Sequence, residues 1–69
     1  MKYAVVIERG PSSFGATVPD LPGCVAVGAT RDEVAALIEE AIEEHIAVLR
    51  EQGIAVPAPS TEVLRVDIG

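Results

Sequence analysis

Two residues with reactive side chains stand alone in this sequence: His45 is the single histidine and Cys24 the single cysteine. His45 falls on an apolar stripe of helical spacing, and no second histidine, cysteine pair or nucleophile lies at a spacing that would build a metal centre or a catalytic pair. Cys24 has no neighbouring base that would activate its thiol. We therefore expect a partly buried histidine with one ring nitrogen hydrogen-bonded to the backbone or to a partner, and a cysteine that packs as a small buried hydrophobe.

The charge balance narrows the class of partner. The formal net charge is −6, and the five basic residues are scattered along the chain. Without a basic stripe nothing would neutralise a phosphate backbone, so we expect no direct binding of DNA or RNA. An acidic surface would instead steer a basic protein partner toward the chain.

The length of the chain and its single cysteine indicate whether it associates with other proteins and in which cellular compartment it works. A domain of 69 residues buries only roughly 60% of its unfolded surface and is marginal alone, so association with itself or with a partner is expected. One cysteine cannot form an internal disulfide, which suits a reducing compartment. No apolar run approaches the ~20 residues of a membrane span, and no signal-peptide pattern is present. We expect a cytoplasmic protein without membrane contact.

Three strands are predicted in the first part of the chain. Three short apolar runs, at residues 3–8, 13–18 and 24–27, are separated by turn residues. The first of them is rich in β-branched side chains. The short turn at residues 9–12 favours an antiparallel hairpin between the first two. A sheet of three strands is the result.

A long helix is predicted next. Thr30 and Glu33 have the spacing of a capping box, and Gly53 has the place of a left-handed residue after a helix, which together bound a helix at residues 31–52. Its apolar residues recur on one face, which we expect to pack against the sheet, with Leu37 and Ile38 in the core. They are Val34, Leu37, Ile38, Ala41, Ile42, His45, Val48 and Leu49.

The chain is expected to end in a fourth strand. Residues 54–60 contain two prolines and read as an extended connection, and residues 62–68 alternate as a strand does. The predicted order is therefore β-β-β-α-β, an α+β fold with a mostly antiparallel sheet and one long helix on one face.

One face of this sheet would remain uncovered. A single helix covers only one face, yet the first strand offers apolar residues to both. Exposed apolar surface of this kind usually marks an association surface. We expect a homo-oligomer, a dimer or tetramer, with Ala4, Val6 and Ile46 at its interface.

The most constrained stretch lies between the second and third strands. Pro19 and Pro22 fix φ and restrict the residues before them, and Gly23 admits a backbone angle that a side chain would forbid. This is a shaped loop. Two roles stay open for it, which are compatible: setting up the third strand and presenting a surface to a partner.

These elements carry an ordered set of motifs. They are a Tyr-led strand at residues 3–8, the loop Val18-Pro19-Asp20-Leu21-Pro22-Gly23-Cys24, the helix start Gly28-x-Thr30-x-x-Glu33, Glu40-Ala41-Ile42 in mid-helix and Gly53-x-x-Val56-Pro57-x-Pro59-Ser60 after it. In this order and spacing the set resembles the HicB-like antitoxin family, the antitoxin half of HicA/HicB toxin-antitoxin pairs.

The resemblance implies a fold and a domain arrangement. The fold is an incomplete RNase H-like one, in which the last strand returns to lie beside the first. Full-length members commonly carry a C-terminal DNA-binding domain, which residues 1–69 lack. We therefore expect a single HicB-like domain over residues 1–69, without operator binding of its own.

The resemblance also implies a partner, a HicA-like toxin. Such toxins are small, basic, RNA-cleaving proteins whose catalytic histidine the antitoxin blocks. We expect the contacts to come from the loop and from the acidic helix flank, at Pro19, Asp20, Leu21, Pro22, Glu40 and Glu44. No cofactor or metal is expected.

An RNase H-like fold also raises the possibility of a nuclease. Its carboxylates would have to hold two metal ions roughly 4 Å apart, and only Glu8 and Asp67 sit where they could approach each other. Solvated surface carboxylates explain the pattern better, so no catalytic residue is assigned. Two alternatives remain beside the antitoxin: a stand-alone oligomeric relative without a toxin, or a small metal-dependent hydrolase using His45 and neighbouring carboxylates.

Overall fold

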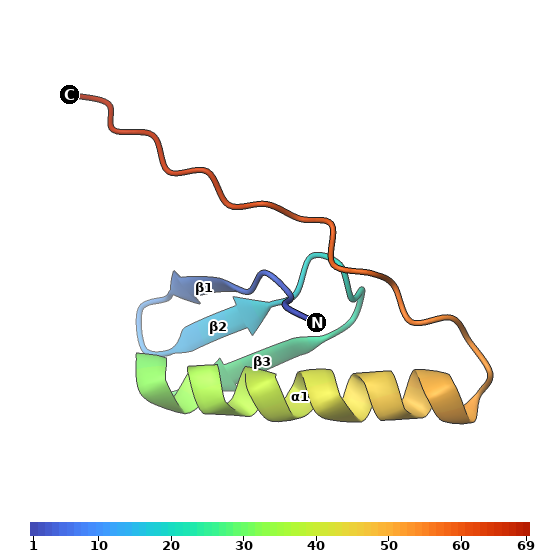
Figure 1. The fold of residues 1–69 in the computed structure, drawn as a ribbon. Helices are drawn as coiled ribbons and strands as arrows, with labels where there is room; N and C mark the ends of the chain where they lie inside the picture. The colour runs from blue at the N-terminus through green and yellow to red at the C-terminus, as the bar shows by residue number, and fades with distance from the viewer.

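The computed structural model describes residues 1–69 as a three-stranded antiparallel sheet with one helix against it (Figure 1). The strands β1 (Val6–Arg9), β2 (Phe14–Thr17) and β3 (Val25–Gly28) lie in the order β1-β2-β3, and α1 (Arg31–Glu51) follows. The predicted α+β class and the first four elements are confirmed. The helix does not combine the length and apolar character that a membrane crossing needs.

The first predicted strand is shorter than expected at its start. β1 begins at Val6, which pairs with Thr17, the last residue of β2. Residues 3–5 extend beyond that point, where the chain after Thr17 turns away into the loop. They therefore have no neighbouring strand to bond to.

Both ends of α1 are closed as the sequence predicts. The extended Thr30 accepts a hydrogen bond at Oγ1 from the Glu33 amide at 3.1 Å. At the other end the amides of Gly53 and Ile54 donate to the carbonyls of Arg50 (3.1 Å) and Leu49 (2.9 Å). This pair of bonds is a Schellman motif, and it requires the positive φ of 68° that Gly53 adopts.

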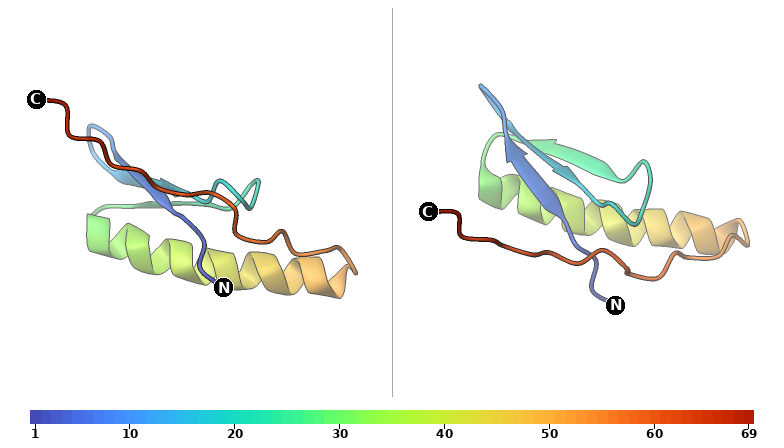
Figure 2. Two further views of the ribbon diagram at one scale, coloured as in Figure 1. Left: turned by 45° about the horizontal axis from the view of Figure 1, so that its top comes forward. Right: turned by 90° about the horizontal axis from the view of Figure 1, so that it is seen from above.

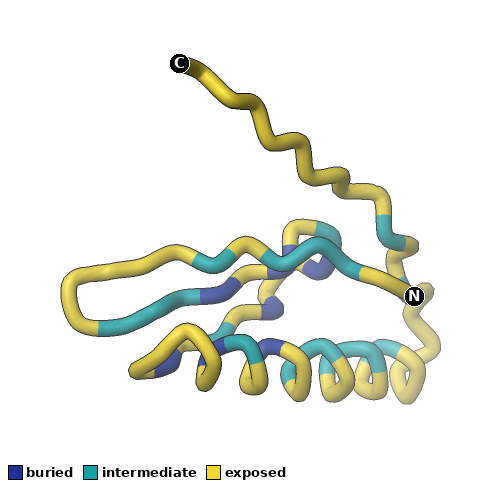
Figure 3. The backbone as a smooth tube through the Cα atoms, turned by 60° about the vertical axis from the view of Figure 1, so that its left-hand side comes forward, coloured by how far each residue is buried: buried dark blue, intermediate teal, exposed yellow.

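The core is a thin layer between α1 and one face of the sheet (Figure 3). Leu21 and Val34 are its largest fully buried side chains. The six buried hydrophobic residues are Ala16, Val18, Leu21, Cys24, Val34 and Ile38. So small a core leaves much apolar surface outside it.

Two members of the predicted helix stripe are exposed to solvent. Leu37 and Val48 are exposed, because the three-stranded sheet is narrower than the apolar stripe. The prediction that Leu37 is a core residue was wrong.

The fourth strand is absent, and its prediction was also wrong. Residues 54–69 form no regular structure, and residues 62–69 are all exposed. After α1 the chain runs back past the N-terminal end of the sheet and then leaves the domain (Figures 1 and 2). Apolar and polar side chains do alternate over residues 62–68. Such a segment becomes a strand only where a neighbouring strand exchanges backbone hydrogen bonds with it.

A pair of neighbouring substitutions tests the position of the core. Ile38→Asp places a carboxylate at a site with 3% exposure, and we expect it to cost about 4 kcal/mol or more and unfold the domain. Leu37→Asp, at 36% exposure, should stay folded. Thermal melts followed by far-UV circular dichroism report both. Equal loss of the fold in the two variants would contradict the placement of α1.

A second test concerns the closest approach of helix and sheet. A Cβ at the buried Gly28 would lie 2.9 Å from the Val34 backbone nitrogen, so Gly28→Ala should destabilise the domain by about 1–3 kcal/mol. Gly15→Ala is the control, since nothing lies within 4 Å of a Cβ there. Urea denaturation compares the two variants. A Gly28→Ala protein as stable as Gly15→Ala would show that α1 shifts away freely.

Candidate partner-binding site

The loop between β2 and β3 is fixed by its own backbone hydrogen bonds. The Val18 amide donates to the Cys24 carbonyl at 3.2 Å, the Leu21 amide to the Val18 carbonyl at 3.1 Å, and the Cys24 amide to the Leu21 carbonyl at 3.0 Å. Gly23 supports the turn with a φ of 84°. The side chains of Val18, Leu21 and Cys24 are all buried in the core. The loop is therefore held in one shape by these hydrogen bonds and by the side chains that it buries in the core.

Only part of the loop is available to a partner. Pro19, Pro22 and Gly23 are exposed and form its crest. Leu21, predicted as a contact residue, has no exposed surface. In this conformation it anchors the loop in the core and offers nothing for a partner to touch. Cys24 is a buried hydrophobe, as predicted, and burial raises the pKa of its thiol.

Asp20 binds a distant part of the same chain. Its Oδ2 accepts from the amides of Ser60 (2.9 Å) and Thr61 (3.0 Å). Its Oδ1 accepts from the hydroxyls of the same residues, at 3.0 Å from Ser60 and 2.7 Å from Thr61. These bonds, the Thr61 amide foremost, lower the pKa of Asp20 from 3.8 to about 2. The carboxylate expected to meet a basic partner is thus engaged within the chain.

A second contact holds the same segment near β1. The Tyr3 hydroxyl donates to the Pro57 carbonyl oxygen. We call the Tyr3–Pro57 bond and the four bonds of Asp20 to Ser60 and Thr61 the tail anchor. Sequence reasoning missed it, since the partners of Asp20 lie 40 and 41 residues away and no local spacing signals the pairing.

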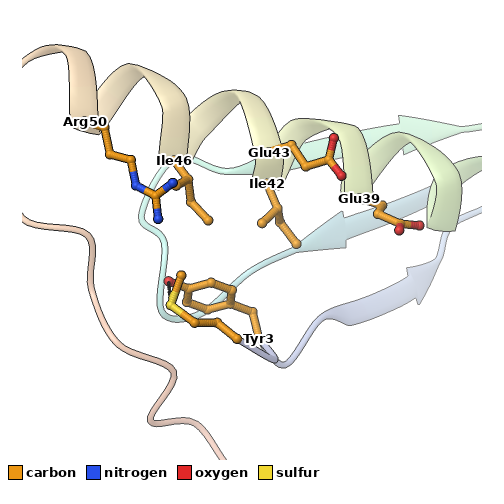
Figure 4. A pocket seen from close by; sticks show the side chains of 7 residues that line it. Tyr3, Glu39, Ile42, Glu43, Ile46 and Arg50 are labelled. Carbon is orange, nitrogen blue, oxygen red and sulfur yellow. Dashed lines mark hydrogen bonds between the residues drawn. The ribbon is translucent and has the colours of Figure 1, made fainter.

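Tyr3 also closes a hollow against the second half of α1 (Figure 4). Ile42 and Ile46 form its apolar wall, and Glu39, Glu43 and Arg50 surround it with charge. Ile46 is partly buried and packs against the core. It therefore lies apart from Val6, which is exposed on the sheet face that α1 leaves open.

A different hollow lies where the loop meets α1. Gly23 and Val25 approach Glu44, His45 and Val48 there, and Cys24 and Ala41 complete the lining. We call it the loop-helix hollow. Of the predicted contact residues, it brings Glu44 to the loop, while Glu40 lies one turn earlier on the exposed helix surface. His45 is half-buried, as predicted. Its ring makes no hydrogen bond within the chain, which leaves a bond to a partner as the remaining expectation.

The open sheet face is a third apolar surface. The pairing register places Val6, Thr17 and Val25 in one row across the sheet, and Glu8, Gly15 and Val27 in the next. All three valines are exposed. Ala4, half-buried, precedes β1. This face has no charge beyond Glu8.

No group of three or more histidine, cysteine or acidic side chains is placed to hold a metal ion. The one ion pair, Arg31 with Asp32 at 3.8 Å, is solvent-exposed. Firm loop geometry, apolar side chains and unpaired carboxylates suit the binding of another protein.

Residues 3–66 match the family model described as the HicB-like antitoxin of bacterial toxin-antitoxin systems. The chain belongs to the HicB-like antitoxin family. The resemblance carried by its motifs is confirmed over nearly the whole sequence.

Relatives of this family member include small proteins of similar length. A UPF0150 protein of Thermoplasma acidophilum is 34% identical over 67 residues, covering 96% of this chain and 97% of its own. A UPF0150 protein of Archaeoglobus fulgidus is 39% identical over 49 residues, covering 70% and 71%. An uncharacterized 14.9 kDa protein of Haemophilus phage HP1 is 35% identical over 57 residues, or 83% of this chain and 43% of the phage protein.

A solved structure shows the same fold in the family. A chain of the HicA3 and HicB3 toxin-antitoxin complex superposes with a TM-score of 0.74 at 30% identity, over 87% of this chain and 70% of that one. The HicB-like fold seen here is therefore one that occurs in a toxin-antitoxin complex.

The tail anchor predicts a specific response to acid. Because the pKa of Asp20 is lowered from 3.8 to about 2, its contribution is fully present above pH 3.8 and is lost as the pH falls through about 2. We expect the Ser60 and Thr61 amide resonances to titrate near that lower value.

The measurement is a series of amide NMR spectra against pH. Asp20→Asn should abolish the titration at both amides, while Asp32→Asn, at the exposed start of α1, should leave it unchanged. A titration midpoint at the ordinary aspartate value in the parent chain would show that the anchor does not form in solution.

Proposed function

We propose that this chain is an antitoxin-type binding domain that neutralises a HicA-like, RNA-cleaving toxin by covering its active site. The observation that carries the proposal is the superposition on a chain of the HicA3 and HicB3 complex, together with the family match. The proposed action is binding alone, with no cofactor.

Charge favours a toxin of basic character. The chain's net charge is −6, and of the carboxylates along the exposed side of α1 only Asp32 is paired with a basic side chain of the chain itself, Arg31. Complementary charge raises the association rate and excludes wrongly charged partners more than it adds affinity. A basic toxin would be steered toward α1.

We place the toxin contact at the loop-helix hollow. Gly23 gives it a rigid exposed rim, next in sequence to the exposed Pro22, and Val25 and Val48 offer exposed apolar side chains beside Glu44. Fixed apolar groups with a neighbouring charge are typical of the centre of a specific interface. Glu40 would extend the acidic contact by one helical turn. Pro19 and Asp20 flank the other side of the loop, where the tail anchor lies.

A second candidate rests on the open sheet face. Its exposed Val6, Val25 and Val27 would suit self-association of a cytoplasmic family member that has no toxin. This alternative predicts an oligomer whose behaviour is unchanged by any co-expressed basic protein.

The experiment takes as the candidate toxin any small basic, HicA-like protein encoded beside the gene for this chain. We expect co-expression of the two to restore growth and to yield a co-purified complex in which RNA cleavage is blocked. Absence of both rescue and complex would overturn the antitoxin proposal.

Two adjacent charge reversals then test the location. Glu44→Lys and Glu43→Lys change the net charge equally, but Glu44 borders the loop-helix hollow while Glu43 borders the Tyr3 hollow. We expect Glu44→Lys to weaken binding at least about 10-fold, which is about 1.4 kcal/mol, and Glu43→Lys to act mainly on the association rate. Isothermal titration and stopped-flow measurements separate the two. Equal losses of affinity would place the contact elsewhere while leaving the function intact.

A further inference from the structure

Gly15 lies on the central strand β2, and the fold itself does not require a glycine there. Its φ is not positive, and a Cβ at this position would have no heavy atom within 4 Å. Gly28 differs, because the packing of α1 excludes a side chain there. A glycine inside a strand weakens it and often marks a place where another molecule approaches closely. Gly15 therefore calls for a reason outside the single chain.

The missing side chain leaves a notch in the open sheet face. Gly15 faces this side because the next residue, Ala16, is buried in the core and side chains alternate along a strand. Glu8 on β1 and Val27 on β3 flank Gly15 directly. The hollow between them has a volume of about 220 Å³. The side chains of the adjoining row complete it, and they are Val6, Thr17 and Val25. We call this hollow the Gly15 notch.

The Gly15 notch combines apolar walls with a single unpaired carboxylate. Its three valines are 42% to 67% exposed, so their side chains are open to a partner. The Glu8 carboxylate takes part in no ion pair and no side-chain hydrogen bond of the chain. Arg9, its neighbour in sequence, lies over the Phe14 ring at 5.8 Å and so belongs to the other face of the sheet. The notch thus holds an anion without a cation.

A lysine or arginine side chain has the chemistry that fits such a notch. Its aliphatic stem packs on apolar surface while its charged end stays with a polar group. Neighbouring strands lie roughly 5 Å apart, so the gap left by Gly15 between Glu8 and Val27 has the width of one unbranched side chain. A purely apolar side chain would bury the Glu8 carboxylate without a partner, which is costly. An acidic one would be repelled.

The notch is continuous with the contact proposed for the toxin. Val25 lines both the Gly15 notch and the loop-helix hollow, so one partner can touch the two hollows across the start of β3. A second copy of the chain would bring another net charge of −6 toward Glu8. A basic toxin brings the cation that this carboxylate lacks. Charge therefore favours the toxin over a second copy as the occupant.

We propose that the Gly15 notch receives a lysine or arginine side chain of the toxin, whose cationic end pairs with Glu8. The inference rests on the proposed function and extends the contact from the loop-helix hollow over β3 onto the open sheet face. It also gives Gly15 a purpose, since a side chain there would strengthen the strand but close the notch.

The first test fills the notch without harming the fold. Gly15→Val places a strand-favouring side chain where space is free, so its thermal melting temperature should equal or exceed that of the parent. Its affinity for the toxin, measured by isothermal titration, should fall at least about 10-fold, and Gly15→Ala should lose less. Thr17→Val is the control, because it lies on the same strand and face and keeps its size. We expect it to bind like the parent.

The second test removes the charge alone. Glu8→Gln should weaken binding and reduce the dependence of the affinity on salt concentration, because one ion pair is lost. Glu39→Gln is the control, since it changes the net charge equally but borders the Tyr3 hollow. A double-mutant cycle against single lysine and arginine substitutions in the toxin should find one residue that is coupled to Glu8.

The outcomes separate this inference from the proposed function. A Gly15→Val chain that binds the toxin as tightly as the parent, or a Glu8→Gln chain that behaves like Glu39→Gln, would overturn the inference while the complex itself stands. A Gly15→Val chain with unchanged toxin binding but an altered oligomeric mass in light scattering would assign the open sheet face to a second copy. A parent chain that forms no toxin complex would overturn both proposals.

Discussion

The whole arrangement depends on the close packing of α1 against the end of β3. Gly28 lets the backbone of Val34 approach where any side chain would intervene, and Val34 is thereby fully buried. This contact brings the helix down onto a sheet only three strands wide. Leu21 packs in the same core cluster as Val34, so the loop between β2 and β3, which its own hydrogen bonds shape, is also held against this core. The binding surfaces follow from where these few residues sit.

Local signals in the sequence were sufficient for the elements that depend on local bonds. Thr30 and Gly53 bound the helix as predicted, since each acts on residues within one turn of itself. The hairpin and the rigid loop were equally predictable from glycine, proline and alternation. The family motifs added the class of protein, because their order along the chain carries information that no single motif has.

Predictions that depended on distant partners fared less well. Residues 62–68 alternate as a strand does, but a strand requires a neighbour, and the sequence does not say where the neighbour is. Leu37 fits the helical stripe, but the width of the sheet decides which part of a stripe is covered. Asp20 was assigned to a partner because it is an acid on a shaped loop; its bonds to Ser60 and Thr61 join residues that only the folded chain brings together. The loop-helix hollow likewise emerges from packing, although Glu44 itself was identified from charge.

The tail anchor divides the chain mechanically as well as structurally. Every buried residue lies before Pro57 in the sequence, and a pull on residues 62–69 would bear first on Asp20 and Tyr3, two side chains on the rim of the domain. Thr61 therefore acts as a joint. Beyond it, the chain is free to vary in length, sequence or attachment without strain on the core, while the direction in which it leaves stays set by a single loop carboxylate and a tyrosine.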